Sequence, residues 1–130
     1  MKAFASTLAL ALLVLTACTP RPQAPGTLSP LEASGLIRND FAVLIDARAP
    51  EAKGPSAQGA LRVPVIAIGT HDDAWATAET RLKGKQAVVY GTTAEEGAAA
   101  AAKLAELGFK ASSIGSFDDW QRAGLPVTGQ

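Results

Sequence analysis

The chain has few of the side chains that many enzymes use for catalysis. Its 130 residues include one cysteine, Cys18, and one histidine, His71. A single cysteine excludes a disulfide within the chain. Basic and acidic side chains number 12 each, so the formal net charge is zero and no basic excess favours nucleic acid. We therefore expect no nucleic-acid partner.

A long hydrophobic run is also missing. Leu8–Leu15 is apolar but far shorter than the roughly 20 residues that span a bilayer. With Lys2 before it, the run has the layout of an export signal. Its ending, Leu15-Thr16-Ala17-Cys18, resembles the lipobox of bacterial lipoproteins, which implies cleavage before Cys18 and a diacylglycerol on the cysteine sulfur. The alternatives are an ordinary signal peptide cut near Ala17 and an uncleaved anchor.

These features divide the chain into three parts. Residues 1–17 are predicted to be a lipoprotein signal peptide, residues 18–29 a lipidated cysteine with a proline-rich tether, and residues 30–130 one domain. Two or three acyl chains anchor a protein stably, since each buried CH₂ adds about 0.8 kcal/mol. The predicted location is exported and anchored to the bacterial membrane. Threonine rather than aspartate follows Cys18, which favours the outer membrane, facing the periplasm, in a Gram-negative cell.

The domain sequence alternates helical and extended patterns. Ser29 is the predicted N-cap of the first helix, whose Leu31, Leu36 and Ile37 are expected to face inward. Alternation of this kind predicts an α/β fold, with a mainly parallel sheet flanked by helices. The expected elements are helix 30–39, strand 41–45 buried on both faces, extended pieces over 62–68, a helix capped by Thr70 and reaching 82, strand 87–90, helix 94–107, strand 110–114 and helix 117–123.

The helix expected over residues 94–107 carries a face of small residues. Gly97, Ala100, Ala101, Leu104, Leu107 and Gly108 share that face at helical spacing. We therefore expect this helix to pack very closely on the sheet.

One strand leads directly into a loop with the position of an active site. Ala87–Tyr90 is an apolar run that breaks at Gly91 and continues into the alanine-rich helix. In open α/β sheets, ligands lie at the carboxyl ends of strands, where unpaired amides of a helix start favour an anion. This loop contains two threonines and two glutamates, without cysteine, histidine, lysine or arginine. It therefore offers no thiol nucleophile and no cation.

Several segments of the chain resemble segments of rhodanese-like domains and follow one another in the same order. Phe41–Arg48 is similar to the hydrophobic strand with an Asp-x-Arg ending that opens such domains. A later stretch of the family is similar to Gly59-Ala60 followed by Val63-Pro64. The strand before the family's active loop is similar to Ala87–Tyr90. Gly115–Val127 resembles the family's closing segment. The resemblance covers nearly the whole domain and implies a single rhodanese-like domain.

The resemblance ends at the active loop. The family's loop reads Cys-x-x-x-x-Arg, often with glycine at the fourth position, and its cysteine carries a persulfide. The corresponding residues here are Gly91, Ala94 and Glu96. Sulfur transfer needs a thiolate stabilised by cations and amides, whereas Glu95 and Glu96 would repel an anion. The catalytic cysteine is therefore absent, and we predict no catalytic residue.

The candidate ligand surface is the equivalent of the active loop together with two charged residues of the neighbouring strand end. It comprises Gly91, Thr92, Thr93, Ala94, Glu95, Glu96, Gly97, Asp46 and Arg48. Asp46 and Arg48 match the family, either as a structural ion pair or as the polar rim of a pocket. We predict no cofactor and no metal, because His71 and the two aspartates after it are interpreted as a helix start.

The leading hypothesis is a membrane-anchored, non-catalytic binding or interaction module of the bacterial cell envelope. Its partners would be the membrane, through acylated Cys18, and an envelope protein or small ligand that the sequence does not name. The alternative is an enzyme of sulfur-compound or phosphate chemistry that uses Thr92, Thr93 or an external thiol. A third possibility is a structural lipoprotein that has kept only the fold.

Overall fold

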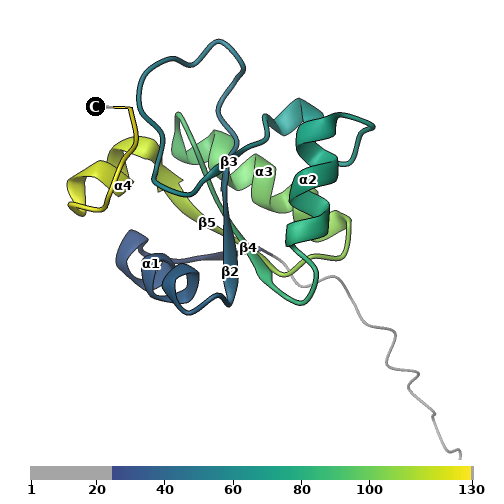
Figure 1. Cartoon of the computed structure of the whole chain (residues 1–130), viewed down its shortest axis with the longest axis horizontal. Helices are drawn as coiled ribbons and strands as arrows, with labels where there is room; N and C mark the ends of the chain where they lie inside the picture. The colour runs from purple at the N-terminus through teal and green to yellow at the C-terminus, as the bar shows by residue number, and fades with distance from the viewer. Residues whose placement is uncertain (1–24, 130) are drawn as a thin grey trace, which may run out of the picture.

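The computed structural model of the chain describes residues 25–129. The predicted signal peptide, the lipidated Cys18 and the first part of the tether lie outside these residues. None of the helices between residues 25 and 129 is long and apolar enough to cross a membrane. The elements, in order, are β1 (Gly26–Thr27), α1 (Pro30–Arg38), β2 (Ala42–Asp46), β3 (Leu61–Arg62), η1 (Val65–Ala67), α2 (Asp73–Arg81), β4 (Gln86–Gly91), α3 (Ala94–Glu106), β5 (Ala111–Ser116) and α4 (Phe117–Arg122) (Figure 1).

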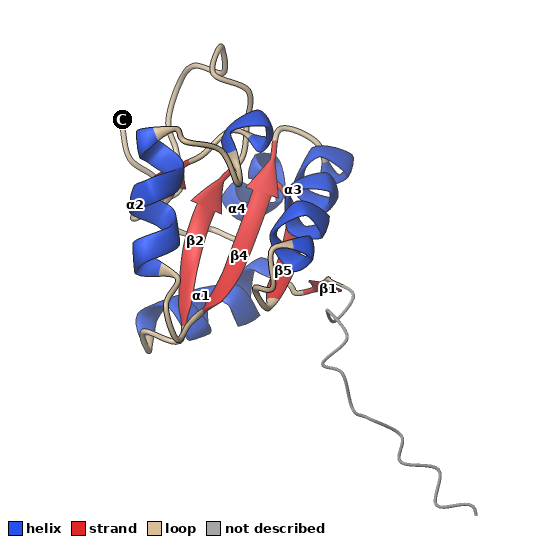
Figure 2. Ribbon diagram, turned by 90° about the vertical axis from the view of Figure 1, so that its right-hand side faces the viewer, coloured by secondary structure: helices blue, strands red, loops and turns tan. Residues whose placement is uncertain are grey.

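The strands form one parallel sheet in the order β1-β5-β4-β2-β3. β2 and β4 pair over the whole length of β2, from Ala42 opposite Gln86 to Asp46 opposite Tyr90. In Figure 2 the arrows of β2 and β4 point in one direction, with helices on both sides of them. The predicted α/β fold with a parallel sheet flanked by helices is therefore confirmed.

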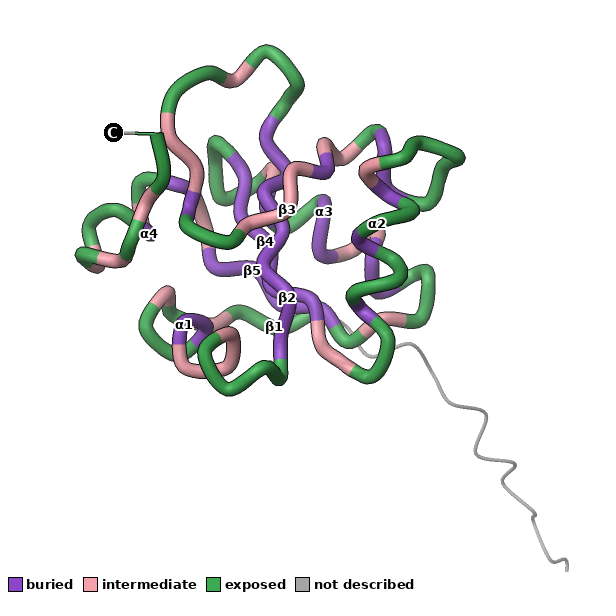
Figure 3. Tube along the Cα trace, viewed as in Figure 1, coloured by how far each residue is buried: buried purple, intermediate pink, exposed green. Residues whose placement is uncertain are grey.

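The two faces of the sheet carry separate hydrophobic clusters. Val43 and Ile45 of β2 pack with α2 and α3, whereas Ala42 and Leu44 pack with α1 and α4. Successive side chains of a strand point to opposite faces, so a strand covered on both sides is apolar throughout. Figure 3 shows β2, β4 and most of β5 as a buried band through the middle of the domain. This arrangement explains why β2 is buried at every position.

The first helix begins as predicted but buries other residues than expected. The Ser29 hydroxyl accepts a hydrogen bond from the Glu32 amide at 3.2 Å, which confirms the predicted N-cap. Leu31, expected to face inward, is 64% exposed, and the buried residues of α1 are Ala33 and Ser34. Small residues face the sheet because α1 lies close to it, and this leaves Leu31 on the outer side.

The strand expected from residue 41 starts later, so the prediction for Phe41 is wrong. β2 begins at Ala42, and the Phe41 side chain is 63% exposed. Asp40 before it has a φ of 62°, which turns the chain sharply out of α1 and directs Phe41 to the surface.

Two expectations between β3 and α2 also need correction. The extended pieces over residues 62–68 are one short strand, β3, followed by the 3₁₀ turn η1 after Pro64. Asp72, rather than Thr70, caps α2 by accepting a hydrogen bond from the Ala74 amide at 2.8 Å. The Thr70 hydroxyl instead donates to the Ala67 carbonyl at 2.7 Å, so it closes the preceding turn.

The small-residue face of α3 is confirmed over most of its length. Gly97, Ala100, Ala101 and Leu104 are buried. A Cβ atom at Gly97 would lie 2.7 Å from the Gly115 carbonyl oxygen of β5, so glycine is what allows this close approach. Leu107 is 47% exposed and Gly108 is exposed, contrary to expectation, because the helix ends at Glu106 and the chain turns away.

The sheet includes residues predicted to belong to the tether. Gly26 and Thr27 form β1, which pairs in parallel with Ser112 and Ser113 of β5. The Leu28 amide adds a hydrogen bond to the Ser113 carbonyl at 3.0 Å. The folded part therefore reaches back to Gly26, ahead of the predicted domain start at residue 30.

Candidate functional site

The carboxyl ends of β2 and β4 bring a carboxylate and a phenol together inside the protein. Asp46 and Tyr90 end the paired stretch of these two strands and are 1% and 0% exposed. The Tyr90 hydroxyl donates a hydrogen bond to Asp46 Oδ2 at 2.8 Å and accepts one from the Ala57 amide at 3.0 Å. Both polar groups are thereby satisfied within the protein.

Arg48 completes this cluster from the start of the loop that follows β2. Its Nε lies 3.0 Å from Asp46 Oδ1 and its Nη2 2.7 Å from Asp46 Oδ2, the two-pronged geometry of a strong ion pair. Nη2 also donates to the Pro55 carbonyl at 3.0 Å and to the Ser56 hydroxyl at 3.1 Å. The guanidinium lies 4.4 Å from the centre of the Phe117 ring, a cation–π contact. Arg48 therefore has few donors left for a ligand.

The protonation states of this cluster are held by its own contacts. Burial alone raises the pKa of Asp46, but hydrogen bonds from Arg48 and Tyr90 outweigh it, so this pKa lies below its ordinary value. Hydrogen bonding to Asp46 raises the pKa of the Arg48 guanidinium. Burial raises the pKa of the Tyr90 phenol far above its ordinary value of about 10. At neutral pH the cluster is a fixed carboxylate, guanidinium and neutral phenol, which is unsuited to moving a proton.

The cluster fastens the loop between β2 and β3 over the edge of the sheet. Arg48 and Tyr90 together hold residues 55–57 of that loop. Arg62 of β3 donates from Nη2 to the carbonyls of Ala49 and Ala52 at 2.7 and 2.9 Å, which secures the first part of the loop. Asp46 and Arg48 thus have the geometry of a structural ion pair beneath the loop.

The equivalent of the active loop is short and closed. β4 ends at Gly91, and α3 begins at Ala94 with Thr93 as its N-cap. A Cβ atom at Gly91 would lie 2.6 Å from both the Glu96 Cβ and the Gly97 amide nitrogen. Real Cβ atoms do not approach other atoms so closely, so a side chain at residue 91 requires the loop to move.

Three amides of this loop, those of Thr92, Glu96 and Gly97, are hydrogen-bonded within it. Glu96 Oε1 accepts the Thr92 amide at 2.7 Å, and Thr93 Oγ1 accepts the Glu96 amide at 3.2 Å. The Gly97 amide donates to the Thr93 carbonyl at 3.2 Å. The Glu96 carboxylate therefore binds the loop amide just before the helix cap and places a negative charge beside the start of α3.

The predicted ligand surface divides into an exposed and a buried part. Gly91, Gly97, Asp46 and Arg48 are buried, and Glu96 is half-buried. The remaining residues form an exposed rim, which we call the loop rim: Thr92, Thr93, Ala94 and Glu95.

Sequence reasoning did not assign a role to Tyr90, Ser56 or Phe117, which surround the ion pair. Tyr90 carried a usable signal, since a phenol at the end of a buried aliphatic strand needs a hydrogen-bond partner. Ser56 and Phe117 carried none, because only the folded loop and α4 bring them to Arg48.

His71 lies exposed before α2, where Asp72 acts as the helix cap. Across residues 25–129 no group of three or more histidine, cysteine, aspartate or glutamate side chains is placed to hold a metal ion. His71 is therefore described as part of a surface turn.

Comparison with known proteins supports the architecture. No family model matches the sequence, and no curated protein matches it. Among solved structures, the BH2092 protein from Bacillus halodurans is similar at 24% identity and a TM-score of 0.66, over 80% of this chain and 77% of that one. The rhodanese-like domain of the Alr3790 protein from Anabaena is 20% identical with a TM-score of 0.61, over 80% and 79% of the two chains. A rhodanese-related protein from Thermoplasma volcanium is 19% identical with a TM-score of 0.61, over 79% and 97%. The chain therefore has the rhodanese-like α/β fold.

Proposed function

We propose that this chain is a lipid-anchored, non-catalytic rhodanese-like binding module of the bacterial cell envelope. The observation that carries the non-catalytic part is the packing around Gly91. This residue stands where rhodanese-like domains have their cysteine, and the space for a side chain there is filled by Glu96 and the Gly97 amide. This packing supports the proposal, because glycine carries no thiol and the surrounding atoms leave no space for a side chain.

The charge of the loop argues in the same direction. Glu95 and Glu96 lie in the first turn of α3, and Glu96 is already bonded to the Thr92 amide. A carboxylate about 5 Å from an anion raises its energy by about 3 kcal/mol at an effective dielectric constant near 20. The loop therefore disfavours the thiolate or persulfide on which sulfur transfer depends.

The surface that this loop offers to a partner is the loop rim. It is acidic through Glu95 and carries the two hydroxyls of Thr92 and Thr93. Such a surface fits a neutral or cationic small ligand, or a basic segment of an envelope protein. The buried cluster of Asp46, Arg48 and Tyr90 would support it from below without touching the ligand.

The membrane anchor is supported by the sequence ending Leu15-Thr16-Ala17-Cys18. Cys18→Ser is expected to block lipid attachment and to leave the precursor uncleaved by the lipoprotein peptidase. The measurement is the intact mass of the chain in the membrane fraction. A mature chain without added lipid mass would refute the anchor and leave the non-catalytic proposal untouched.

Thiosulfate:cyanide sulfurtransfer tests the non-catalytic proposal. The chain from Thr19 onward contains every strand and both hydrophobic clusters, and it is expected to show no transfer above a blank without protein. Gly91→Cys is expected to add little, because the new side chain is crowded and lies beside Glu95 and Glu96. Adding Glu96→Arg and then Ala94→Gly should raise any activity in that order, since a cation stabilises the thiolate and glycine lets the loop relax.

The same assay distinguishes the alternative enzyme hypothesis from the non-catalytic proposal. Clear turnover by the unmodified chain would refute the non-catalytic proposal. If that turnover were then lost in Thr92→Val or Thr93→Val, an enzyme using a threonine hydroxyl would replace it. Equal activity of Gly91→Cys and the triple variant would show that only the nucleophile is missing and that the loop is not an obstacle.

A further inference from the structure

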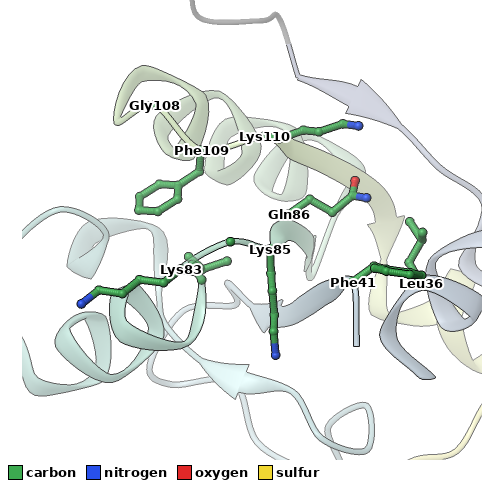
Figure 4. A pocket seen from close by; sticks show the side chains of 10 residues that line it. Leu36, Phe41, Lys83, Lys85, Gln86, Gly108, Phe109 and Lys110 are labelled. Carbon is green, nitrogen blue, oxygen red and sulfur yellow. The ribbon is translucent and has the colours of Figure 1, made fainter. Parts of the chain in front are cut away.

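The loop rim lies at the carboxyl ends of the strands. The amino ends, on the opposite side of the sheet, carry a basic and apolar surface. Three connections lead into the amino ends of β2, β4 and β5, and they surround a hollow on this side of the sheet (Figure 4). Its lining includes Phe41, Lys83, Lys85 and Lys110. We call these four residues the basic face.

The charge of the basic face is opposite to that of the loop rim. Lys83 and Lys110 are exposed and make no ion pair with any of residues 25–129. Lys85 pairs at 2.6 Å with Asp40, the one acidic side chain of the connections into β2, β4 and β5. At the other end of the sheet, the first turns of α3 and α4 are acidic. The domain is therefore electrically polar along the strand direction.

The lysines of the basic face are spread rather than focused. In Figure 4 the side chains of Lys83, Lys85 and Lys110 leave the hollow in different directions. A site for one small anion would bring its cations to a single point. Ammonium groups spread around an exposed aromatic ring instead fit an extended anionic surface, with Phe41, 63% exposed, able to enter its interfacial layer.

The chain enters the domain at this same end. β1 runs parallel to β5 and pairs with its second and third residues, so Gly26 lies near the amino end of β5, close in sequence to Lys110. In Figure 2 the arrows of β2 and β4 point away from the end of the domain where β1 lies. The predicted lipid on Cys18 is therefore joined to the basic end of the domain, not to the acidic end.

The length of the tether limits the possible orientations. From Cys18 to Pro25 the chain spans at most about 25 Å, at about 3.6 Å per residue. A domain of about 100 residues has a radius of gyration of about 13 Å, which for a sphere gives a diameter of about 34 Å. The reach of the tether is shorter than the diameter of the domain, so its attachment at the basic end favours orientations that keep the basic face near the membrane.

We propose that the basic face docks onto the anionic lipid surface of the membrane in which Cys18 is anchored, so that the loop rim points away from the membrane. The orientation rests on the proposed lipid anchor, but the affinity of the basic face for anionic lipid does not. Docking of this kind would hold the domain in one orientation and present the loop rim to partners in the surrounding compartment.

Vesicle binding by the chain from Thr19 onward tests the surface without the lipid. It is expected to bind vesicles of phosphatidylglycerol and phosphatidylcholine, and to bind pure phosphatidylcholine far more weakly. Each basic residue near an anionic surface contributes about a fivefold gain in partitioning, so Lys83→Glu with Lys110→Glu should reduce binding by about 25-fold or more. The matched control is Lys53→Glu, an exposed lysine in the loop between β2 and β3, which should keep wild-type binding.

Equal binding to both kinds of vesicle, or an equal loss in the control, would overturn the proposal. Saturation by inorganic phosphate without vesicle binding would overturn it too, because the basic face would then be a site for a small anion. Raised salt should weaken the vesicle binding, since exposed charges are screened.

A second measurement reports orientation in the lipidated protein. Acylation occupies the sulfur of Cys18, so Phe41→Cys and Ala49→Cys each provide one thiol for an environment-sensitive dye. In reconstituted anionic vesicles the dye at residue 41 should shift to the blue, and the dye at residue 49, exposed after β2, should not. Unshifted dyes at both positions, in protein whose mass shows the lipid, would overturn the docking while leaving the anchor intact.

Discussion

The Tyr90 hydroxyl donates a hydrogen bond to Asp46 Oδ2 at 2.8 Å across the carboxyl ends of two neighbouring strands. This contact links the sheet to the loop above it, because the same hydroxyl accepts the Ala57 amide. At the carboxyl ends of β2 and β4 the chain therefore has a buried polar cluster whose groups bind one another and the loop above them.

Tyr90→Phe is expected to destabilise the domain by about 1–3 kcal/mol, because the Ala57 amide is left without an acceptor inside the protein. The urea midpoint measures this loss. Thr128→Val, which removes an exposed hydroxyl bonded to the Ser56 carbonyl in the same region, should change stability by less than about 0.5 kcal/mol. Equal midpoints for the two variants would contradict the structural role of the phenol.

Acid is expected to weaken the fold through Asp46. Its pKa is lower in the folded protein than in the unfolded chain, so its contribution is complete above the unfolded pKa of about 3.9. That contribution is lost as the pH falls through the folded pKa. Urea unfolding at a series of pH values below about 5 should show the decline.

Asp46→Asn is the companion variant for this pH dependence. It should be less stable at neutral pH by about 3–5 kcal/mol, because the buried Arg48 guanidinium loses its partner. Its stability should also decline less steeply in acid than that of the unmodified chain. Identical slopes would show that the acid sensitivity arises from other carboxylates.

Gly91→Ala is expected to destabilise the domain by about 1–3 kcal/mol, as overpacking commonly does. The added Cβ would lie 2.6 Å from the backbone nitrogen of Gly97, and a backbone atom cannot move aside as a flexible side chain can. Thermal or urea unfolding measures the change. The control is Gly35→Ala in α1, where a Cβ meets nothing within 4 Å and should stabilise the helix by about 0.5–1 kcal/mol. A neutral Gly91→Ala would mean that the loop is open enough for a side chain.

Ala101→Leu is expected to cost about 1–3 kcal/mol, because Ala101 is fully buried between α3 and the sheet. Ala99→Leu, at an exposed position of the same helix, should change stability by less than about 0.5 kcal/mol. The two urea midpoints provide the comparison. If they agreed, the small-residue face would not be closely packed.

Local rules were enough to predict much of the fold. The strand over residues 87–90, the helix after it and the cap Ser29 follow from apolar runs, helical spacing and a capping side chain, which act over a few residues. The absence of cysteine and arginine from the loop at Gly91 is likewise a property of the sequence alone.

Only the tertiary structure decided how these parts meet. β1 could not be predicted, because Gly26 and Thr27 become a strand only by pairing with β5, far along the chain. Phe41 and Leu31 have apolar side chains yet lie exposed, since burial depends on the sheet edge and on helix placement rather than on residue type. The closure of the loop over Gly91 likewise arises from the seating of α3 on the sheet, where Gly97 meets β5. Sequence composition thus determined that the loop has no thiol, and long-range packing decided that a side chain at Gly91 has no space.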